Sequence, residues 1–144
     1  MTLEQLLEQE LGPHAATLAG DFRQARVPVG RVVLEAGAAA GGLVAVLEGA
    51  VRVEVEAPAG GFGVRREVGP GSLLGLLACI DEGVRSARCV AASEAVVATL
   101  DAASFERWYG GSDAASLAFL DWVGRQLADD LRQLSDVLVE AVRG

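Results

Sequence analysis

The chain has 144 residues, of which 51% are hydrophobic and 22% are charged, and its net charge is −8. This length suits one domain with a sizeable core, and the composition is too apolar for a disordered chain. An acidic chain without a long basic stripe is a poor partner for DNA or RNA, and no window holds the roughly 18 uninterrupted apolar residues of a membrane span.

The first expected element is an N-terminal helix. The segment from Thr2 to Gln5 has the capping-box pattern, in which Thr2 caps the helix and Gln5 reaches back. Four leucines then share one helical face before Gly12-Pro13 ends the helix. They are Leu3, Leu6, Leu7 and Leu11. A second short helix is expected from His14 to Asp21. Because this start is acidic and amphipathic, it is unlike a signal peptide, and we expect a cytoplasmic location.

Short valine-rich runs, separated by glycine and proline, fill the chain from Phe22 to about Leu100. The clearest run is 51–56, where apolar and charged side chains alternate strictly, as in a strand with one buried and one solvated face. Many short strands at this spacing predict a mainly β fold, a double-stranded β-helix or jelly-roll barrel with flanking helices. The expected strands are 26–29, 31–35, 43–47, 50–56, 63–68, 86–92 and 95–100.

Helical periodicity returns after the strands. Residues 101–109 predict a short helix that ends at Gly110-Gly111, and Ser112 or Asp113 caps a much longer one. Along the long helix, one stripe follows alternating spacings of three and four, which are the a and d positions of a heptad. The stripe consists of Leu117, Leu120, Gly124, Leu127, Leu131, Leu134, Leu138 and Ala141.

This stripe has two interpretations. It can cover the open end of the barrel, and we expect the first half, through about Val123, to do so with the help of Phe119 and Trp122. For the second half, the regular pattern favours a two-helix seam between two copies of the chain. The predicted homodimer interface is Leu127, Leu131, Leu134 and Leu138.

The sequence argues against an enzyme. A metal site inside such a barrel needs two or three histidines plus a carboxylate, but His14 is the only histidine and precedes the expected strands. No imidazole base is therefore available to a serine or to Cys79, and the motifs GxSxG and GxxxxGK[ST] do not occur. We predict no catalytic residues, no metal and no cofactor. Cys79 and Cys89 are interpreted as small buried hydrophobes, with a redox pair as the alternative.

Residues 69–87 are the most informative segment. They contain a glycine-rich turn, a short apolar helix and a loop that delivers Arg85. Backbone N–H groups at a helix start attract anions, and a guanidinium binds phosphate oxygens in pairs. The segment therefore predicts a phosphate cradle. The alternative is a surface loop in which Arg85 pairs with Asp81 or Glu82.

In order and spacing, this segment resembles the phosphate-binding cassette of cyclic-nucleotide-binding domains, the family of the catabolite activator protein and of protein kinase A regulatory subunits. The resemblance extends from about Leu18 to Leu138, and 47–53 resembles the family's L-x-G-x-V-x-V strand pair. It implies one domain over 1–144, with helices in 1–21, a barrel in 22–100 and helices in 101–144. It also implies that Arg85 grips a cyclic phosphate and that Ser86 adds a hydroxyl. The implied ligand-binding residues are Gly75, Leu76, Leu77, Ala78, Arg85, Ser86, Ala87 and Ser135.

The chain departs from the family's pattern at several positions. Leu76 stands where the family has a glutamate that accepts the ribose 2′-hydroxyl, and the loss of a charged acceptor costs about 1.5–3 kcal/mol, roughly ten- to 150-fold in affinity. Val84 replaces the usual proline before Arg85. Ser135 either touches the purine or is an exposed helix serine. The chain stops at Gly144, without the helix-turn-helix of the family's transcription factors, so we expect a sensor domain alone.

Two functions remain open. In the first, the chain is a regulatory sensor of a cyclic nucleotide, such as cAMP or cGMP, or of another small phosphate ligand, and it acts on an unknown effector protein. By the resemblance, the long helix then forms a parallel dimer seam and lids the base of the ligand. In the second, Leu76 occludes the pocket and the barrel serves only dimerisation or docking.

Overall fold

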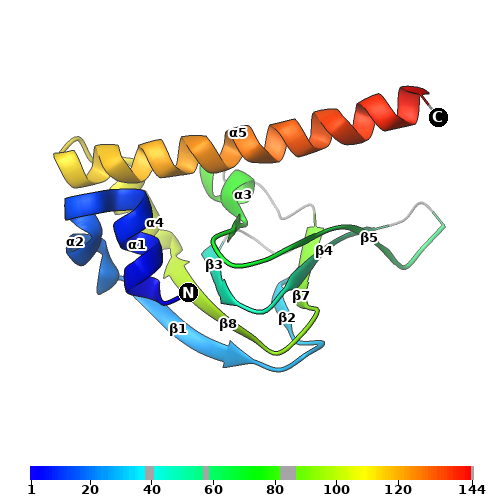
Figure 1. Ribbon diagram of the computed structural model, residues 1–144, viewed down its shortest axis with the longest axis horizontal. Coiled ribbons are helices and arrows are strands. Elements are labelled where there is room, and N and C mark those ends of the chain that lie inside the picture. The colour runs from blue at the N-terminus through cyan, green and yellow to red at the C-terminus, as the bar shows by residue number, and fades with distance from the viewer. Residues whose placement is uncertain (38–40, 57–58, 82–86, 144) are drawn as a thin grey trace.

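The computed structural model describes residues 1–37, 41–56, 59–81 and 87–143. These residues form two four-stranded antiparallel sheets, a group of helices at one end and a long helix that lies across the molecule (Figure 1). The predicted mainly β fold with an N-terminal helix and a long C-terminal helix is confirmed.

The elements follow one another in the predicted order. The N-terminal part contains α1 (Leu3–Leu11), the 3₁₀ turn η1 (Gly12–His14) and α2 (Ala15–Ala19). The strands are β1 (Phe22–Val27), β2 (Val32–Leu34), β3 (Gly42–Glu48), β4 (Val51–Glu56), β5 (Phe62–Val68), β6 (Leu73–Leu74), β7 (Ala87–Ala91) and β8 (Ala95–Asp101). The helix α3 (Leu76–Asp81) lies between β6 and β7, and α4 (Ala102–Tyr109) and α5 (Ala114–Arg143) follow β8.

Two hydrophobic clusters hold the fold together. The sheets have the strand orders β1-β8-β3-β6 and β2-β7-β4-β5. One cluster packs α1, α4 and the first half of α5 onto the first sheet, with Leu6, Phe105 and Phe119 among its members. The other cluster lies between the two sheets and includes Val46 and Val53. Because the sheets cover each other on one face only, the helices are needed to bury the rest.

The N-terminal helix forms as the capping box predicts. Thr2 Oγ1 accepts the Gln5 N–H at 3.1 Å, and the Thr2 N–H is donated to Gln5 Oε1 at 2.8 Å. The two bonds satisfy backbone and side-chain groups reciprocally at the helix start. All four predicted leucines on this helix are buried.

Two strands differ from the prediction. β1 spans Phe22–Val27 instead of 26–29, because only Phe22 and Val27 are buried in it and the alternation that would reveal a strand is missing. Pairing with β8 along the whole strand, from Phe22 opposite Leu100 to Val27 opposite Ala95, compensates for this. β6 was not predicted, because two residues are too short to show a period; both pair with β3.

Gly49 explains the tight connection between β3 and β4. Its φ is 81°, in a region that side chains with a Cβ rarely adopt. A Cβ there would also lie 2.4 Å from the carbonyl oxygen of Glu94, so the neighbouring turn leaves no room for one. The glycine of the motif in 47–53 is therefore a steric requirement of this turn.

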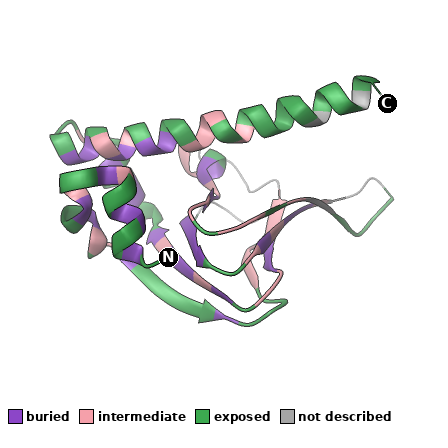
Figure 2. Ribbon diagram, viewed as in Figure 1, coloured by how far each residue is buried: buried purple, intermediate pink, exposed green. Residues whose placement is uncertain are grey.

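The helix α5 uses a different face from the predicted one. Its first half covers the barrel end, as expected, and Phe119, Trp122 and Val123 are buried (Figure 2). However, Leu117 of the leucine stripe is 57% exposed, and Leu127 of the stripe is only half-buried against the cluster under the helices. With 3.6 residues per turn, the buried face and the leucine stripe lie roughly a quarter of a turn apart. The buried face and the leucine stripe are thus different faces of one helix that meet at Leu127.

Candidate functional site

The predicted cassette is described in its first part only. Gly75 has a φ of 86° and links β6 to α3, so the expected glycine turn into a short helix is present. Arg85 and Ser86 lie outside the described residues, and their predicted roles stay predictions. Ala87 opens β7 and packs against the cluster between the sheets.

Leu76 is a core residue. Its side chain is 3% exposed and belongs to the cluster under the helices. Cys79 and Ile80 pack against the same cluster, as residues three and four positions further along a helix do. Leu77, by contrast, is 64% exposed. The side chain at position 76 therefore anchors α3 to the barrel.

The charged side chain of Arg66 lies on the inner face of the second sheet near this end. Directly opposite residues of neighbouring strands share a face. Arg66 of β5 lies opposite Val53 of β4, and Val53 lies opposite Cys89 of β7. Since Val53 and Cys89 belong to the cluster between the sheets, Arg66 is on the inner face too. The paired positions two residues further along β4 carry only small side chains. They are Gly63 of β5, Val55 of β4 and Ala87 of β7.

Three polar side chains of α5 meet Arg66 and β6. Arg66 Nη1 donates to Asp130 Oδ1 at 3.2 Å and to Gln133 Oε1 at 2.6 Å. The same Asp130 oxygen accepts from Gln126 Nε2 at 3.1 Å, and Gln126 Oε1 accepts the Leu73 N–H at 3.0 Å. These bonds join β5, β6 and α5. The sequence analysis missed all of them, because it followed only the apolar residues of the long helix.

The outer face of the same sheet holds a buried carboxylate. Glu54 is 6% exposed and accepts hydrogen bonds from Arg88 at 2.7 Å and from Arg52 at 3.3 Å. The Arg88 guanidinium lies 3.8 Å from the centre of the Phe62 ring. The Arg88 hydrogen bond, helped by Arg52, lowers the Glu54 pKa against the effect of burial. The prediction that this face of the strand is solvated was wrong for Glu54, because the two arginines cover its side chain.

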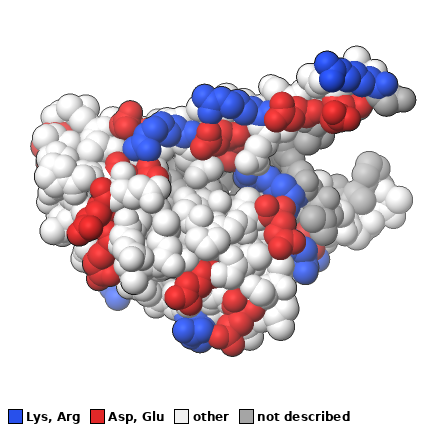
Figure 3. All heavy atoms as spheres, in the orientation of Figure 1, with Lys and Arg blue, Asp and Glu red and all other residues white. Residues whose placement is uncertain are grey.

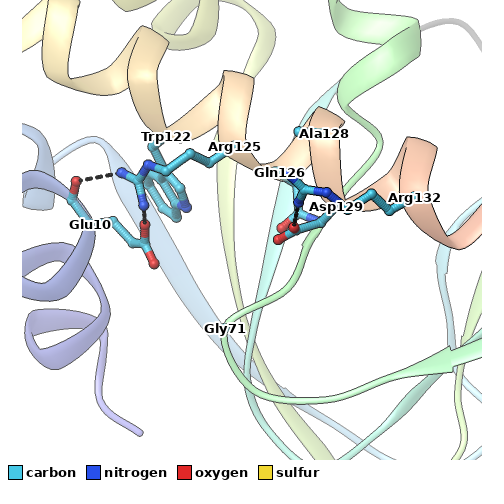
Figure 4. Close-up of a pocket in the computed structure, with 8 residues that line it drawn as sticks. All are labelled: Glu10, Gly71, Trp122, Arg125, Gln126, Ala128, Asp129 and Arg132. Carbon is cyan, nitrogen blue, oxygen red and sulfur yellow. Dashed lines mark hydrogen bonds and ion pairs between the residues drawn. The ribbon is translucent and has the colours of Figure 1, made fainter.

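A cavity lies elsewhere, between α1, the turn at Gly71 and α5. It has a volume of about 360 Å³ (Figure 4). Arg125 points from α5 to Glu10 of α1, and Arg132 points to Asp129 on its own helix (Figure 4). Each guanidinium on its wall is already paired. Of the lining residues, only Gly71 belongs to the segment 69–87, so we do not assign the ligand to this cavity.

The remaining predicted residues lie on α5. Ser135 is exposed, as are Leu131, Leu134 and Leu138, whereas Leu127 is half-buried against the cluster under the helices. Figure 3 shows arginine and carboxylate side chains alternating along this helix on the face in view. Among the described residues, no group of three or more His, Cys, Asp or Glu side chains is placed to hold a metal ion. No described helix is both long and apolar enough to cross a membrane.

Residues 24–110 match the sequence model of the cyclic nucleotide-binding domain. The chain belongs to this family. A cyclic nucleotide-binding domain from Methylobacillus flagellatus KT has a TM-score of 0.86 at 20% identity, over 96% of this chain and 82% of that one. The N-terminal domain of a Streptomyces coelicolor A3(2) transcriptional regulator has a TM-score of 0.71 at 25% identity, over 89% of this chain and 93% of that one. The Thermus thermophilus catabolite activator protein has a TM-score of 0.70 at 26% identity, over 94% of this chain but 61% of that one.

No curated protein matches the chain in sequence. Membership in the cyclic nucleotide-binding domain family indicates a regulatory binding module. Residues 69–87, which resemble the family's cassette, lie within the part of the chain that matches the family.

Proposed function

We propose that the chain is a non-catalytic regulatory module that binds a cyclic nucleotide or a related small phosphate ligand through Arg85, Ser86 and the backbone of residues 75–78. The observation that carries the proposal is the family match over 24–110, which includes this segment. The positive φ of Gly75 at the start of α3 supports it, since a cassette needs this sharp entry into its helix.

The ligand chemistry follows from the residues. Arg85 supplies a guanidinium that suits two phosphate oxygens, and Ser86 supplies a hydroxyl donor. Position 76 carries an apolar side chain that is packed into the core, so it offers no acceptor to a ribose hydroxyl. We therefore expect weak binding of cAMP and cGMP, or binding of a ligand whose recognition does not use that hydroxyl.

A thermal titration tests this proposal. The melting temperature is measured against cAMP, cGMP and cyclic dinucleotides at millimolar concentrations, for the wild type and for Arg85→Ala. A ligand at 100 times its Kd stabilises the folded state by about 2.7 kcal/mol. The matched control is Arg26→Ala, because Arg26 is 65% exposed in a surface ion pair with Glu94. Ligand stabilisation that Arg85→Ala abolishes and Arg26→Ala retains supports the proposal. The absence of any shift refutes it.

A second function is favoured by the burial of Leu76 together with the exposed leucines of α5. In it, the chain binds no nucleotide and acts as a dimerisation or docking module. Leu131 and Leu138 are 65% and 57% exposed on a helix whose other face is already occupied by the barrel. A regular apolar stripe of this kind matches the seam of a two-stranded coiled coil.

The seam is tested by light scattering. Leu131→Asp and Leu134→Asp each place a charge in the proposed seam, so both variants should be monomers where the wild type is a dimer. Leu117→Asp is the control, because Leu117 is also exposed, at 57%, but lies at the opposite end of α5. A monomeric wild type at micromolar concentrations refutes the seam. Loss of the dimer in the control variant alone would move the interface to the first half of the helix.

A further inference from the structure

The strand β1 (Phe22–Val27) forms an edge of the first sheet. It is the outermost strand of the order β1-β8-β3-β6 and pairs with β8 along its whole length. Its four middle residues are exposed, and Figure 2 shows most of the strand in the colour of exposed residues. In an antiparallel sheet, alternate residues direct their backbone N–H and C=O groups to the same side. The outer side of β1 therefore offers backbone groups to a further strand.

The other sheet edges are protected in ways that β1 is not. β6 has two residues, and β2 has three residues and a register shift against β7. β5 also pairs with a register shift, and its Arg66 is bonded to Asp130 of α5. Short strands, bulges and covering elements commonly protect a sheet edge. β1 has six residues, no proline within it and an unbroken register. Among the described strands, it is therefore the edge best suited to accept another strand.

Two exposed arginines, Arg23 and Arg26, give this edge its charge. Side chains alternate between the two faces of a strand, so these arginines, which are three positions apart, lie on opposite faces. Antiparallel pairing of all six residues with a second copy would place each Arg23 opposite an Arg26. Like charges directly opposite each other are destabilising. An incoming strand with two carboxylates three positions apart would instead meet an arginine at each of them.

Two acidic side chains of the chain itself lie near these arginines. Arg26 Nη1 donates to Glu94 at 2.6 Å, and the two side chains are 65% and 66% exposed. Such an exposed pair contributes little, and Arg26 keeps further N–H groups for a second carboxylate. Asp101 interacts electrostatically with Arg23, but its carboxylate already accepts the Ser104 N–H at 2.7 Å as the cap of α4. Both guanidiniums therefore retain donors for an incoming strand.

We propose that β1 is a docking edge for an extended acidic segment of a partner protein, which adds to the sheet as a strand beside β1. Backbone hydrogen bonds supply the affinity, and two carboxylates spaced as Glu-x-x-Glu select the segment through Arg23 and Arg26. The edge lies outside residues 69–87, so the proposal does not rest on nucleotide binding.

Fluorescence anisotropy tests the edge with a defined probe, the fluorescein-labelled peptide Thr-Val-Glu-Val-Thr-Glu-Val-Thr. The peptide should bind the full chain. Binding should weaken about tenfold in the double variant Arg23→Glu and Arg26→Glu, because two attractive pairs become repulsive. The matched control is Arg132→Glu with Arg143→Glu, which changes the net charge equally but lies on α5, and it should bind as the wild type does. No binding at millimolar concentration, or equal losses in the two double variants, overturns the proposal.

A charge-reversed peptide checks that the double variant is folded. With lysine in place of both glutamates, the peptide should not bind the wild type but should bind the Arg23→Glu and Arg26→Glu variant. An unfolded or damaged edge would not show this rescue. If the lysine peptide binds the wild type as well as the glutamate peptide does, the selection of carboxylates by the two arginines is wrong.

N-methylated peptides test strand addition itself. An added strand donates only alternate N–H groups to β1. Methylation of one alternate set should therefore abolish binding, whereas methylation of the other set should leave it unchanged. Amide exchange in 22–27, followed by mass spectrometry, should slow when the peptide binds, and exchange in α1 should not change. Equal effects of the two methylated peptides would show binding by charge alone and would overturn the docking edge.

A second copy of the chain is the competing occupant. It would slow exchange in 22–27 as the protein concentration rises, without any peptide. That result overturns the assignment of the edge to an acidic partner. Exchange in 22–27 that is independent of protein concentration, together with protection by the glutamate peptide, supports the assignment.

Discussion

The substitution Leu76→Glu decides whether position 76 belongs to the core or to a ligand pocket. Leu76 is 3% exposed, and the loss of its burial costs about 1.5–3 kcal/mol. A carboxyl group in such a place has its pKa raised, to as much as 8–9 in fully buried cases. Keeping it neutral at pH 7 against an unfolded pKa near 4.3 costs about 3–4 kcal/mol more.

The expected loss for Leu76→Glu at pH 7 is therefore about 4.5–7 kcal/mol, a large part of the roughly 5–15 kcal/mol by which a typical domain is stable. The direction of the pH dependence follows from the raised pKa of the Leu76→Glu carboxyl group in the folded state. The charge-related penalty disappears below the unfolded pKa and grows as pH rises. Between pH 5 and pH 7, the difference from the wild type should increase by about 1.4 kcal/mol per pH unit.

Urea unfolding, followed by the fluorescence of Trp108 and Trp122, measures this difference at pH 5, 6 and 7. The control is Leu77→Glu, because Leu77 is 64% exposed and its substitution should cost less than about 0.5 kcal/mol at every pH. A cost below about 1 kcal/mol for Leu76→Glu, without pH dependence, would show that the side chain at 76 does not enter the core. The occlusion argument would then be refuted, and the variant should bind cAMP more tightly than the wild type.

Three further predictions concern stability. Glu54→Gln should lose about 1–3 kcal/mol in urea unfolding, because Arg52 and Arg88 then face a neutral group. Since the Arg88 hydrogen bond lowers the Glu54 pKa below 4.5, this contribution is present above pH 4.5 and is lost as pH falls through the folded pKa, which a pH series of wild type and variant would reveal. Gly49→Ala should cost about 2–4 kcal/mol of stability, because of backbone strain and the contact of the new Cβ with the Glu94 carbonyl oxygen. Gly60 has a φ of 94°, but a Cβ there would have nothing within 4 Å, so Gly60→Ala should cost about 1–2 kcal/mol. Equal losses for the two variants would contradict the steric argument. Asp113→Ala should lower the free energy of unfolding by about 1 kcal/mol, because Asp113 Oδ1 accepts the Ser116 N–H at the start of α5. An unchanged free energy of unfolding would show that this cap is not needed.

The sequence predicted the elements whose signal is local. The capping box at Thr2, the strict alternation in 51–56 and the glycine after α4 each act within a few residues, and each element was found. β1 was misplaced because its stability comes from pairing with β8, more than 65 positions away along the chain. Pattern analysis does not see such pairing, since the four residues in the middle of β1 are all exposed.

The candidate site could be predicted only in part, for a related reason. A glycine turn followed by an apolar helix is a local pattern, and Gly75 and α3 were found from it. The role of Leu76 depends on what packs around it, and that environment comes from α1, α4 and α5. Glu54 was expected to be solvated because its neighbours alternate, but its burial depends on Arg88 from another strand.

The long helix contains the one site signal that sequence analysis could have used and did not. Phe119, Trp122, Gln126, Asp130 and Gln133 are spaced by three and four, so they form a stripe of their own beside the leucines. The stripe is apolar where it covers the core and polar where it passes β6 and Arg66. A helix that only covers a core has no use for this change, because polar groups on a buried face cost free energy unless they are paired. The change from apolar to polar therefore marks the place where α5 leaves the hydrophobic cluster under the helices and meets polar groups of β5 and β6.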